Sequence, residues 1–194
     1  MIHPTPDPHA PSDTQLLADH VAGDDAAFSA LMERHADRLW TLAVRVMKNH
    51  EDAADALQDA MISAFRRAGD FRGDAAVTTW LHRIVMNACL DRLRRIAVRK
   101  ADPLPEDVDR APELTAPDDP ESAAVSSSIA DEVTAALGKI NADQRAALVL
   151  VDLEGYSVDE AARILGCAPG TVKSRCSRGR TALAGLLKHL KGVD

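Results

Sequence analysis

The chain of 194 residues is 46% hydrophobic but only 3% aromatic, and its net charge is -7. This length allows one large or two small domains, and a composition rich in alanine and leucine favours helices over sheets. The sequence has no apolar run as long as a membrane span and no leader-like N-terminus, so we expect a soluble, cytoplasmic protein. Three cysteines without paired spacing argue against a disulfide framework or a zinc site, and we expect two of them to pack as small hydrophobic residues.

The negative charge is concentrated in one stretch. Residues 102–121 contain eight acidic side chains against one arginine, a local sum of -7, so the rest of the chain sums to zero. The overall charge therefore does not exclude a nucleic-acid partner, because the cations outside this stretch are clustered. Five prolines and three consecutive serines fall in the same region, and we expect residues 101–128 to form a flexible acidic linker without a fold of its own.

The N-terminal part predicts a helical domain over residues 13–100. Residues 1–12 are rich in proline and are expected to be a disordered tail. Ser12 and Gln15 form a capping-box pattern, which predicts a short helix that ends at Gly23. Apolar residues then recur at helical spacing over residues 28–48, which predicts a core-forming helix.

A further helix, predicted over residues 51–67, has two faces of different character. One face is apolar and carries Leu57, Met61, Ala64 and Phe65. The other face carries what we call the acid row: Asp52, Asp55, Gln58 and Asp59. Stacked like charges cost a few tenths of a kcal/mol per pair. A basic partner would offset that cost, and a merely solvated face is the alternative.

A turn-rich loop over residues 69–74 leads into a helix that becomes basic. Its predicted core stripe consists of Trp80, Leu81, Ile84, Val85 and Ala88. Arg83 and Asn87 lie away from the centre of that stripe. Beyond it the helix carries a cationic cluster: Arg92, Arg94, Arg95, Arg99 and Lys100, against Asp91 alone.

The C-terminal part, residues 129–194, predicts four helices that end in a helix-turn-helix. The first spans about residues 129–140, and Asn141 caps the second. Ser157 with Glu160 is a capping box that opens the third helix, which Gly166 ends. Cys167 to Gly170 supply the turn, and the last helix restarts at Thr171. Cations follow without any acid up to Lys191, so one side can pack while the other meets DNA. A solvated basic helix is the alternative.

These parts, in this order, resemble the extracytoplasmic-function (ECF) group of bacterial sigma-70 factors. The motifs that carry the resemblance are Asp52–Asp59, Phe71–Asp74, Thr79–Asn87 and Gly170–Arg175. Each motif alone is weakly specific, but four in the family's order cover the chain from about Asp13 to Leu190. The resemblance implies an all-α fold of two small domains, sigma region 2 and region 4, joined by the acidic linker.

The resemblance also implies site residues. The acid row would bind a coiled coil on the largest subunit of core RNA polymerase. The residues implied for the single-stranded -10 promoter element are Arg72, Arg83, Asn87, Arg92, Arg94 and Arg95. Those implied for the major groove of the -35 element are Thr171, Lys173, Ser174, Arg175, Ser177, Arg178 and Arg180. An anti-sigma protein would hold the factor inactive, the free protein would be a monomer, and no cofactor or metal is implied.

Other function classes fit the residues less well. An enzyme is not indicated, because the histidines are scattered and neither a nucleophile elbow nor a glycine-rich phosphate loop is present. A stand-alone helix-turn-helix regulator would bind duplex DNA without polymerase, usually as a dimer on a palindrome. A helical adaptor that binds only protein would not need two separated cation clusters.

Overall fold

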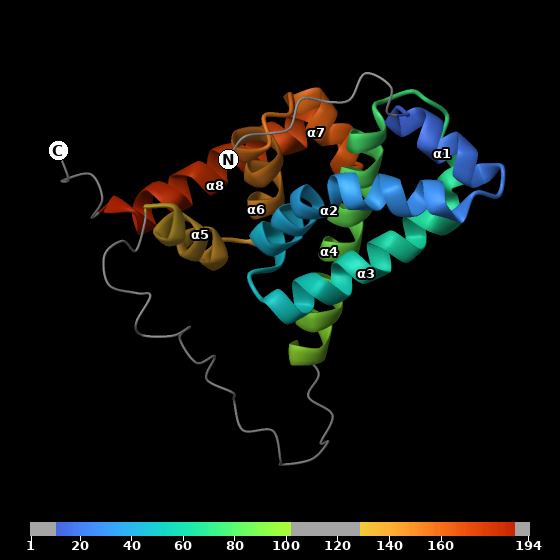
Figure 1. The fold of residues 1–194 in the computed structure, drawn as a ribbon. Coiled ribbons are helices and arrows are strands. Elements are labelled where there is room, and N and C mark those ends of the chain that lie inside the picture. Colours follow the sequence, from blue (N-terminus) through green and yellow to red (C-terminus); the bar gives the residue numbers. More distant parts are fainter. Residues whose placement is uncertain (1–10, 102–128, 189–194) are drawn as a thin grey trace, which may run out of the picture.

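The computed structural model describes residues 11–101 and 129–188, and every regular element in these ranges is helical (Figure 1). The predicted all-α class is therefore confirmed. The expected disordered tail apart from Pro11 and Ser12, the acidic linker apart from Ala101, and the last six residues lie outside the described residues. Within the described ranges, no helix combines the length and apolar character needed to cross a membrane.

The N-terminal helices begin at side-chain caps. They are α1 (Asp13–Val21), α2 (Asp25–Met47), α3 (His50–Arg67), a 3-10 turn η1 (Ala68–Asp70) and α4 (Val77–Ala101). Ser12 accepts a hydrogen bond from the Gln15 amide at 3.2 Å, as predicted, although the Gln15 side chain donates to Asp19 instead of closing the box. Asp24 and Asn49 cap α2 and α3 in the same way. These caps satisfy backbone donors that would otherwise lack partners.

Alanine, not leucine or phenylalanine, forms the buried face of α3. The buried residues of this helix are Ala53, Ala56, Ala60 and Ala64. On the face that the sequence marks as apolar, Met61 and Phe65 are 36% and 44% exposed, and Leu57 is half-buried. Small side chains let α3 lie close against α2 and α4. The Phe65 ring lies instead beside Phe28, at 5.1 Å between centroids.

The C-terminal half contains the predicted helices and one additional distortion. The elements are α5 (Ile129–Lys139), α6 (Ala142–Leu148), a π-helical segment η2 (Val149–Leu153), α7 (Val158–Leu165) and α8 (Pro169–Leu186). Asn141 caps α6, and both hydrogen bonds of the Ser157–Glu160 capping box are present. Gly166 ends α7 at φ 62°, a left-handed conformation that favours glycine. The last helix begins at Pro169 rather than at the predicted Thr171, because proline is well suited to a first helical position.

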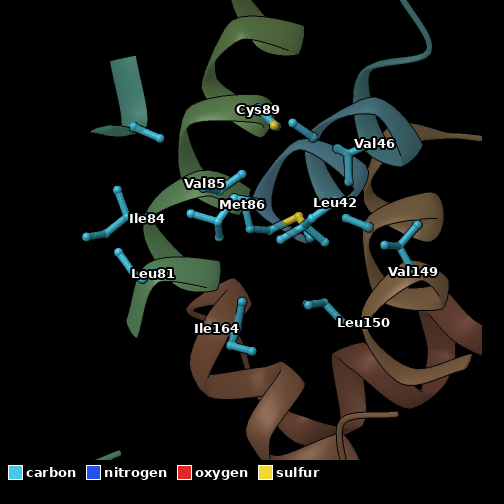
Figure 2. Close-up of a cluster of buried hydrophobic side chains, with 14 of the residues drawn as sticks. Leu42, Val46, Leu81, Ile84, Val85, Met86, Cys89, Val149, Leu150 and Ile164 are labelled. Carbon is cyan, nitrogen blue, oxygen red and sulfur yellow. The ribbon is translucent and has the colours of Figure 1, made fainter. Parts of the chain in front are cut away.

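Both halves contribute to one hydrophobic core. Figure 2 shows Leu42 and Met86 of the N-terminal helices in the same cluster as Val149, Leu150 and Ile164 of the C-terminal half, and all five are buried. The packing runs mainly from α4 to α7, with further contacts from α2 and α4 to α6 (Figure 1). The halves therefore lie against each other across an apolar surface.

Two polar contacts lie at the edge of that shared core. The Glu154 carboxylate is 2.8 Å from Arg45 Nη1 and 3.4 Å from Arg38 Nη2, and its side chain is only 7% exposed. The Tyr156 hydroxyl lies 2.8 Å from His82 Nδ1, and the two rings meet edge-on. We call Glu154 with Arg38 and Arg45 the carboxylate clasp.

Candidate nucleic-acid and protein interfaces

The last helix has one packed side and one exposed side. Val172 and Cys176 are buried, and Gly179 packs on α6 so closely that a Cβ atom there would lie 2.8 Å from Leu148 Cδ1. The exposed side carries four residues that we call the α8 face: Lys173, Ser174, Ser177 and Arg178. Their i, i+1, i+4, i+5 spacing places them on one surface, as a helix that enters a major groove requires.

Two other arginines of α8 are held by acids of the preceding helices. Arg175 Nη2 donates to Asp143 Oδ2 at 2.8 Å. Arg180 donates to both carboxylate oxygens of Asp152, at 3.0 and 2.7 Å. Both arginines were predicted to meet DNA, and each already has a carboxylate partner that ties α8 to α6 or η2. The predicted residue Thr171 is half-buried, and its carbonyl accepts a hydrogen bond from Ser174.

The cations of the α8 face differ from that pair. In the described part of the chain, neither Lys173 nor Arg178 has a carboxylate partner. Arg178 donates only to the carbonyl and hydroxyl of Ser174, both at 3.3 Å. Their charge is therefore available to phosphates or to base edges, whereas the charge of Arg175 and Arg180 is largely matched.

A cleft of about 1920 Å³ opens between the two halves. One of its walls includes four of the residues predicted for the -10 element: Arg72, Arg83, Asn87 and Arg95. All four are exposed, and Trp80 lies beside them with its ring edge-on to Phe71 at 5.7 Å. The opposite wall comes from α7 and the turn before α8. Cations, an amide and an aromatic pair together suit an unstacked base and its phosphates.

The remaining predicted cations of α4 are paired. Arg92 bridges the acid row: its Nε lies 2.9 Å from Asp52 Oδ1 and its Nη2 lies 2.6 Å from Asp55 Oδ2. Arg94 pairs with Asp91 at 2.6 Å. Arg92, which was predicted to bind the -10 element, therefore pairs with Asp52 and Asp55, which were predicted to bind the polymerase.

The outer surface of α3 is both acidic and apolar. Gln58 and Asp59 are exposed, and Asp59 lines the cleft without an ion pair among the described residues. Beside them, Ile62 and Phe65 are each 44% exposed. Exposed apolar side chains next to unpaired polar ones are typical of protein interfaces, where an apolar centre is bordered by a polar rim.

Burial sets the ionisation of two groups in the core. Burial, with help from the nearby charge of Arg38, lowers the pKa of His82 to about 4, so the ring is neutral at pH 7. Its Nδ1 shares a hydrogen bond with the Tyr156 hydroxyl, while Nε2 has no hydrogen-bond partner among the described residues. Burial raises the pKa of the Cys89 thiol to about 12. Cys89 and Cys176 are buried, which confirms that two cysteines pack as small hydrophobic residues.

Sequence patterns did not identify four residues that hold α8 and the two halves of the molecule in position. Asp143 and Asp152 pair with α8, while Glu154 and Tyr156 meet the N-terminal half. Asp152 interrupts an otherwise apolar run, and that interruption is the only local signal among the four. Helical spacing does not show which residue of another helix an acid will meet.

Two family models match the chain: "Sigma-70 region 2" over residues 31–99 and "Sigma-70, region 4" over residues 130–183. The ECF RNA polymerase sigma factor SigM of Mycobacterium tuberculosis H37Rv is 53% identical over 187 residues, which cover 96% of this chain and 90% of SigM. The chain belongs to the ECF sigma factors of the sigma-70 family. The region 2 match contains the acid row and the exposed residues of α4, and the region 4 match contains the α8 face.

Solved structures show the same likeness for this sigma factor. One is the sigma factor RpoE in complex with the anti-sigma factor NepR from Bartonella quintana. That match has a TM-score of 0.64 and 29% identity, and it covers 83% of this chain and 96% of RpoE. The other is CnrH in complex with the cytosolic domain of CnrY, with a TM-score of 0.62 and 28% identity, covering 91% of this chain and 97% of CnrH. As a sigma factor, the protein acts as a transcription regulator rather than as an enzyme.

Proposed function

We propose that this ECF sigma factor binds core RNA polymerase and directs it to promoters that carry a -10 and a -35 element. The observation that supports this most directly is the α8 face. Lys173 and Arg178 are exposed beside two serines, on the side of α8 opposite the buried Val172 and Cys176. Such a helix can lie in the major groove, and an arginine there can take both acceptors of a guanine.

The -35 assignment gives the α8 cations different roles. Lys173, Ser174, Ser177 and Arg178 read base edges or nearby phosphates. Arg175 and Arg180 hold α8 in position through Asp143 and Asp152, and Arg180 also remains exposed enough to contact a phosphate. Thr171 lies at the start of the helix, where backbone amides favour a phosphate.

The -10 assignment rests on the cleft wall formed by α4 and the loop that precedes it. Asn87 offers an amide for a base edge, and Trp80 with Phe71 offers aromatic surface for stacking. Arg72, Arg83 and Arg95 hold the phosphates of the same strand, so binding should weaken steeply with salt. In this arrangement Arg92 and Arg94 act mainly through their ion pairs with α3 and Asp91.

The polymerase assignment rests on the outer surface of α3. Gln58 and Asp59 meet basic residues of the polymerase coiled coil, and Arg92 keeps Asp52 and Asp55 in position. The two sequence matches support a region 2 domain over residues 13–100 and a region 4 domain over residues 129–194, with the acidic linker between them.

An anti-sigma protein is the proposed negative regulator. The similar RpoE was solved in complex with the anti-sigma factor NepR, and the similar CnrH was solved in complex with the cytosolic domain of CnrY. A partner that covers the α3 surface and the cleft would block polymerase and promoter together. The factor would act in the cytoplasm as a monomer until polymerase binds it.

Run-off transcription from a randomised promoter library tests the proposed function. Purified core RNA polymerase is assayed with and without the protein. Transcripts that depend on the protein, from templates sharing two short elements at fixed spacing, are the expected result. Silent polymerase together with retardation of duplex DNA by the protein alone would instead identify a stand-alone regulator.

A further inference from the structure

Ser174 and Arg178 lie about one turn apart on the exposed side of α8 and are joined by two hydrogen bonds. Arg178 Nη2 donates to the Ser174 hydroxyl, and Arg178 Nε donates to the Ser174 carbonyl, both at 3.3 Å. The Ser174 hydroxyl itself donates to the Thr171 carbonyl at 2.9 Å. Residues three and four apart are neighbours on a helix surface, so these contacts follow the α8 face.

The direction of each hydrogen bond in this chain is fixed by the groups that form it. A guanidinium has only donors, and a carbonyl oxygen only accepts. The single hydroxyl hydrogen of Ser174 therefore points to the Thr171 carbonyl, and the hydroxyl oxygen accepts from Arg178. The hydroxyl thus offers Arg178 an acceptor at a defined place on the helix surface.

These contacts occupy one edge of the Arg178 guanidinium. The Nε hydrogen and one Nη2 hydrogen form the side edge of this planar group, and both are directed at Ser174. The terminal edge, formed by Nη1 and the second Nη2 hydrogen, has no hydrogen-bond partner among the described residues. Two parallel donors at that edge match the O6 and N7 acceptors of a guanine in the major groove.

Arg180 shows how a charged partner differs from Ser174. The side edge of Arg180 donates to both carboxylate oxygens of Asp152, at 3.0 and 2.7 Å, and that carboxylate matches the charge of the arginine. The acceptors that contact Arg178 are uncharged, so its positive charge is left for DNA. They also bind more weakly, since hydrogen bonds to ionised acceptors are shorter and stronger. Ser174 therefore biases the orientation of Arg178 without neutralising it.

We propose that Ser174 is a positioning residue for Arg178: it holds the side edge of the guanidinium, so that the terminal edge faces a guanine of the -35 element. The inference rests on the proposed function, because it concerns how α8 reads a base. An exposed arginine has many rotamers, and binding restricts them at a cost in entropy. A side chain that already favours the binding orientation loses less entropy. Ser174 thus contributes to base preference through Arg178.

A double-variant cycle in the holoenzyme tests this role. Full-length Ser174→Ala, Arg178→Ala and the double variant are each assembled with core RNA polymerase. Run-off transcription is then measured from templates that differ at single base pairs of the upstream element. Arg178→Ala should abolish the preference at one base pair. Ser174→Ala should lower the preference at that same base pair about 3- to 10-fold, because it removes the hydroxyl contact but keeps the carbonyl contact.

Two further variants in this assay separate positioning from direct contact. In the double variant, Ser174→Ala should add nothing to the effect of Arg178→Ala, because a residue that acts through another has no effect once that residue is gone. Ser174→Thr should keep the wild-type preference, since a threonine hydroxyl in a helix also reaches the carbonyl one turn earlier. Both side chains are exposed, and equal melting temperatures check that a lost preference is not a lost fold.

Three results of the cycle would overturn the inference. One is an unchanged preference in Ser174→Ala. The second is a loss at a different base pair, and the third is a further loss in the double variant. The last two would show that Ser174 contacts DNA itself.

A measurement on the free protein makes the positioning test independent of DNA. The order parameter of the Arg178 Nε–H bond, from nitrogen relaxation, should be lower in Ser174→Ala than in wild type. Ser177→Ala is the matched control, because Ser177 is exposed on the same face and has no hydrogen bond with Arg178, so this order parameter should keep its wild-type value. Equal order parameters in wild type and Ser174→Ala would refute the positioning role. A wild-type holoenzyme without any base preference in the upstream element would overturn the proposed function instead, and the order parameter would still decide whether Ser174 orients Arg178.

Discussion

At the scale of single residues, the structure divides chemically similar arginines into different roles. Arg175 and Arg178 lie three positions apart on α8, yet only Arg175 has a carboxylate partner in the described structure. An arginine whose guanidinium already donates to a carboxylate gains little binding energy by contacting a base instead. A guanidinium without such a partner can donate to two acceptors of a base. The division gives opposite expectations for the two residues.

Replacing Arg178 by alanine should reduce the preference for one base pair of the -35 element without reducing the stability of the fold. We expect a loss of about 1–3 kcal/mol of preference at one base pair of the -35 element, with an unchanged melting temperature. Arg175→Ala and Asp143→Ala should both lower the melting temperature, because each removes the same ion pair. Anisotropy titrations against duplexes that vary one base at a time, beside thermal melts, provide the comparison. A stable Arg175→Ala with altered base preference would contradict it.

Gly179 is required by the contact between α8 and α6. An added Cβ would lie 2.8 Å from Leu148 Cδ1 and 3.1 Å from its Cγ, and Leu148 is buried. Gly179→Ala should therefore lower the free energy of unfolding by about 1–3 kcal/mol. Gly185→Ala on the same helix meets nothing within 4 Å and should be neutral or stabilising by up to about 1 kcal/mol. Urea denaturation of both variants measures the difference, and equal destabilisation would contradict the packing argument.

At the scale of elements, α3 shows how composition decides which side of a helix is buried. Its alanines face α2 and α4, and the larger Ile62 and Phe65 face outward. A helix placed this close to its neighbours has no room for long side chains on its inner face. The outward apolar residues then lie beside Gln58 and Asp59, where a protein partner would use them.

Reversing the charge at Asp59 should weaken polymerase binding while leaving the fold intact. Asp59→Lys is a cleaner test than a change at Asp55, because Asp55 also holds Arg92. We expect the affinity for core polymerase to fall about 10- to 100-fold, in line with the cost of losing a charge at an interface. Glu33→Lys controls for the change in net charge, and fluorescence titration with core polymerase gives both values. Wild-type affinity in folded Asp59→Lys would remove Asp59 from the interface.

At the scale of the whole molecule, the two halves form one core whose polar edge includes a neutral histidine. This histidine, His82 of α4, is buried with its ring against Tyr156, and protonation there would place an unhydrated charge near Arg38. The pKa is therefore about 4 in the packed protein and about 6.5 in an unfolded chain. Between these values the unfolded chain binds more protons, so the free energy of unfolding decreases as the pH falls.

The contribution of His82 should be visible between pH 7 and pH 5. We expect a loss of about 2 kcal/mol of unfolding free energy over this range from this group alone. His82→Gln should be less stable at pH 7 but should show a smaller slope, because the buried titrating group is gone. Denaturant melts at several pH values measure both slopes. Equal slopes in the two proteins would contradict the assignment.

The sequence by itself determined the helices, their caps and the cationic face of α8, because capping and periodicity depend on residues within one or two turns. Its motif order also indicated the ECF family. The pairing of Arg175 with Asp143, the outward position of Phe65 and the carboxylate clasp around Glu154 were decided only by the tertiary structure. Each depends on which helix faces which, and that is fixed by packing between residues far apart in the chain, which local patterns do not encode.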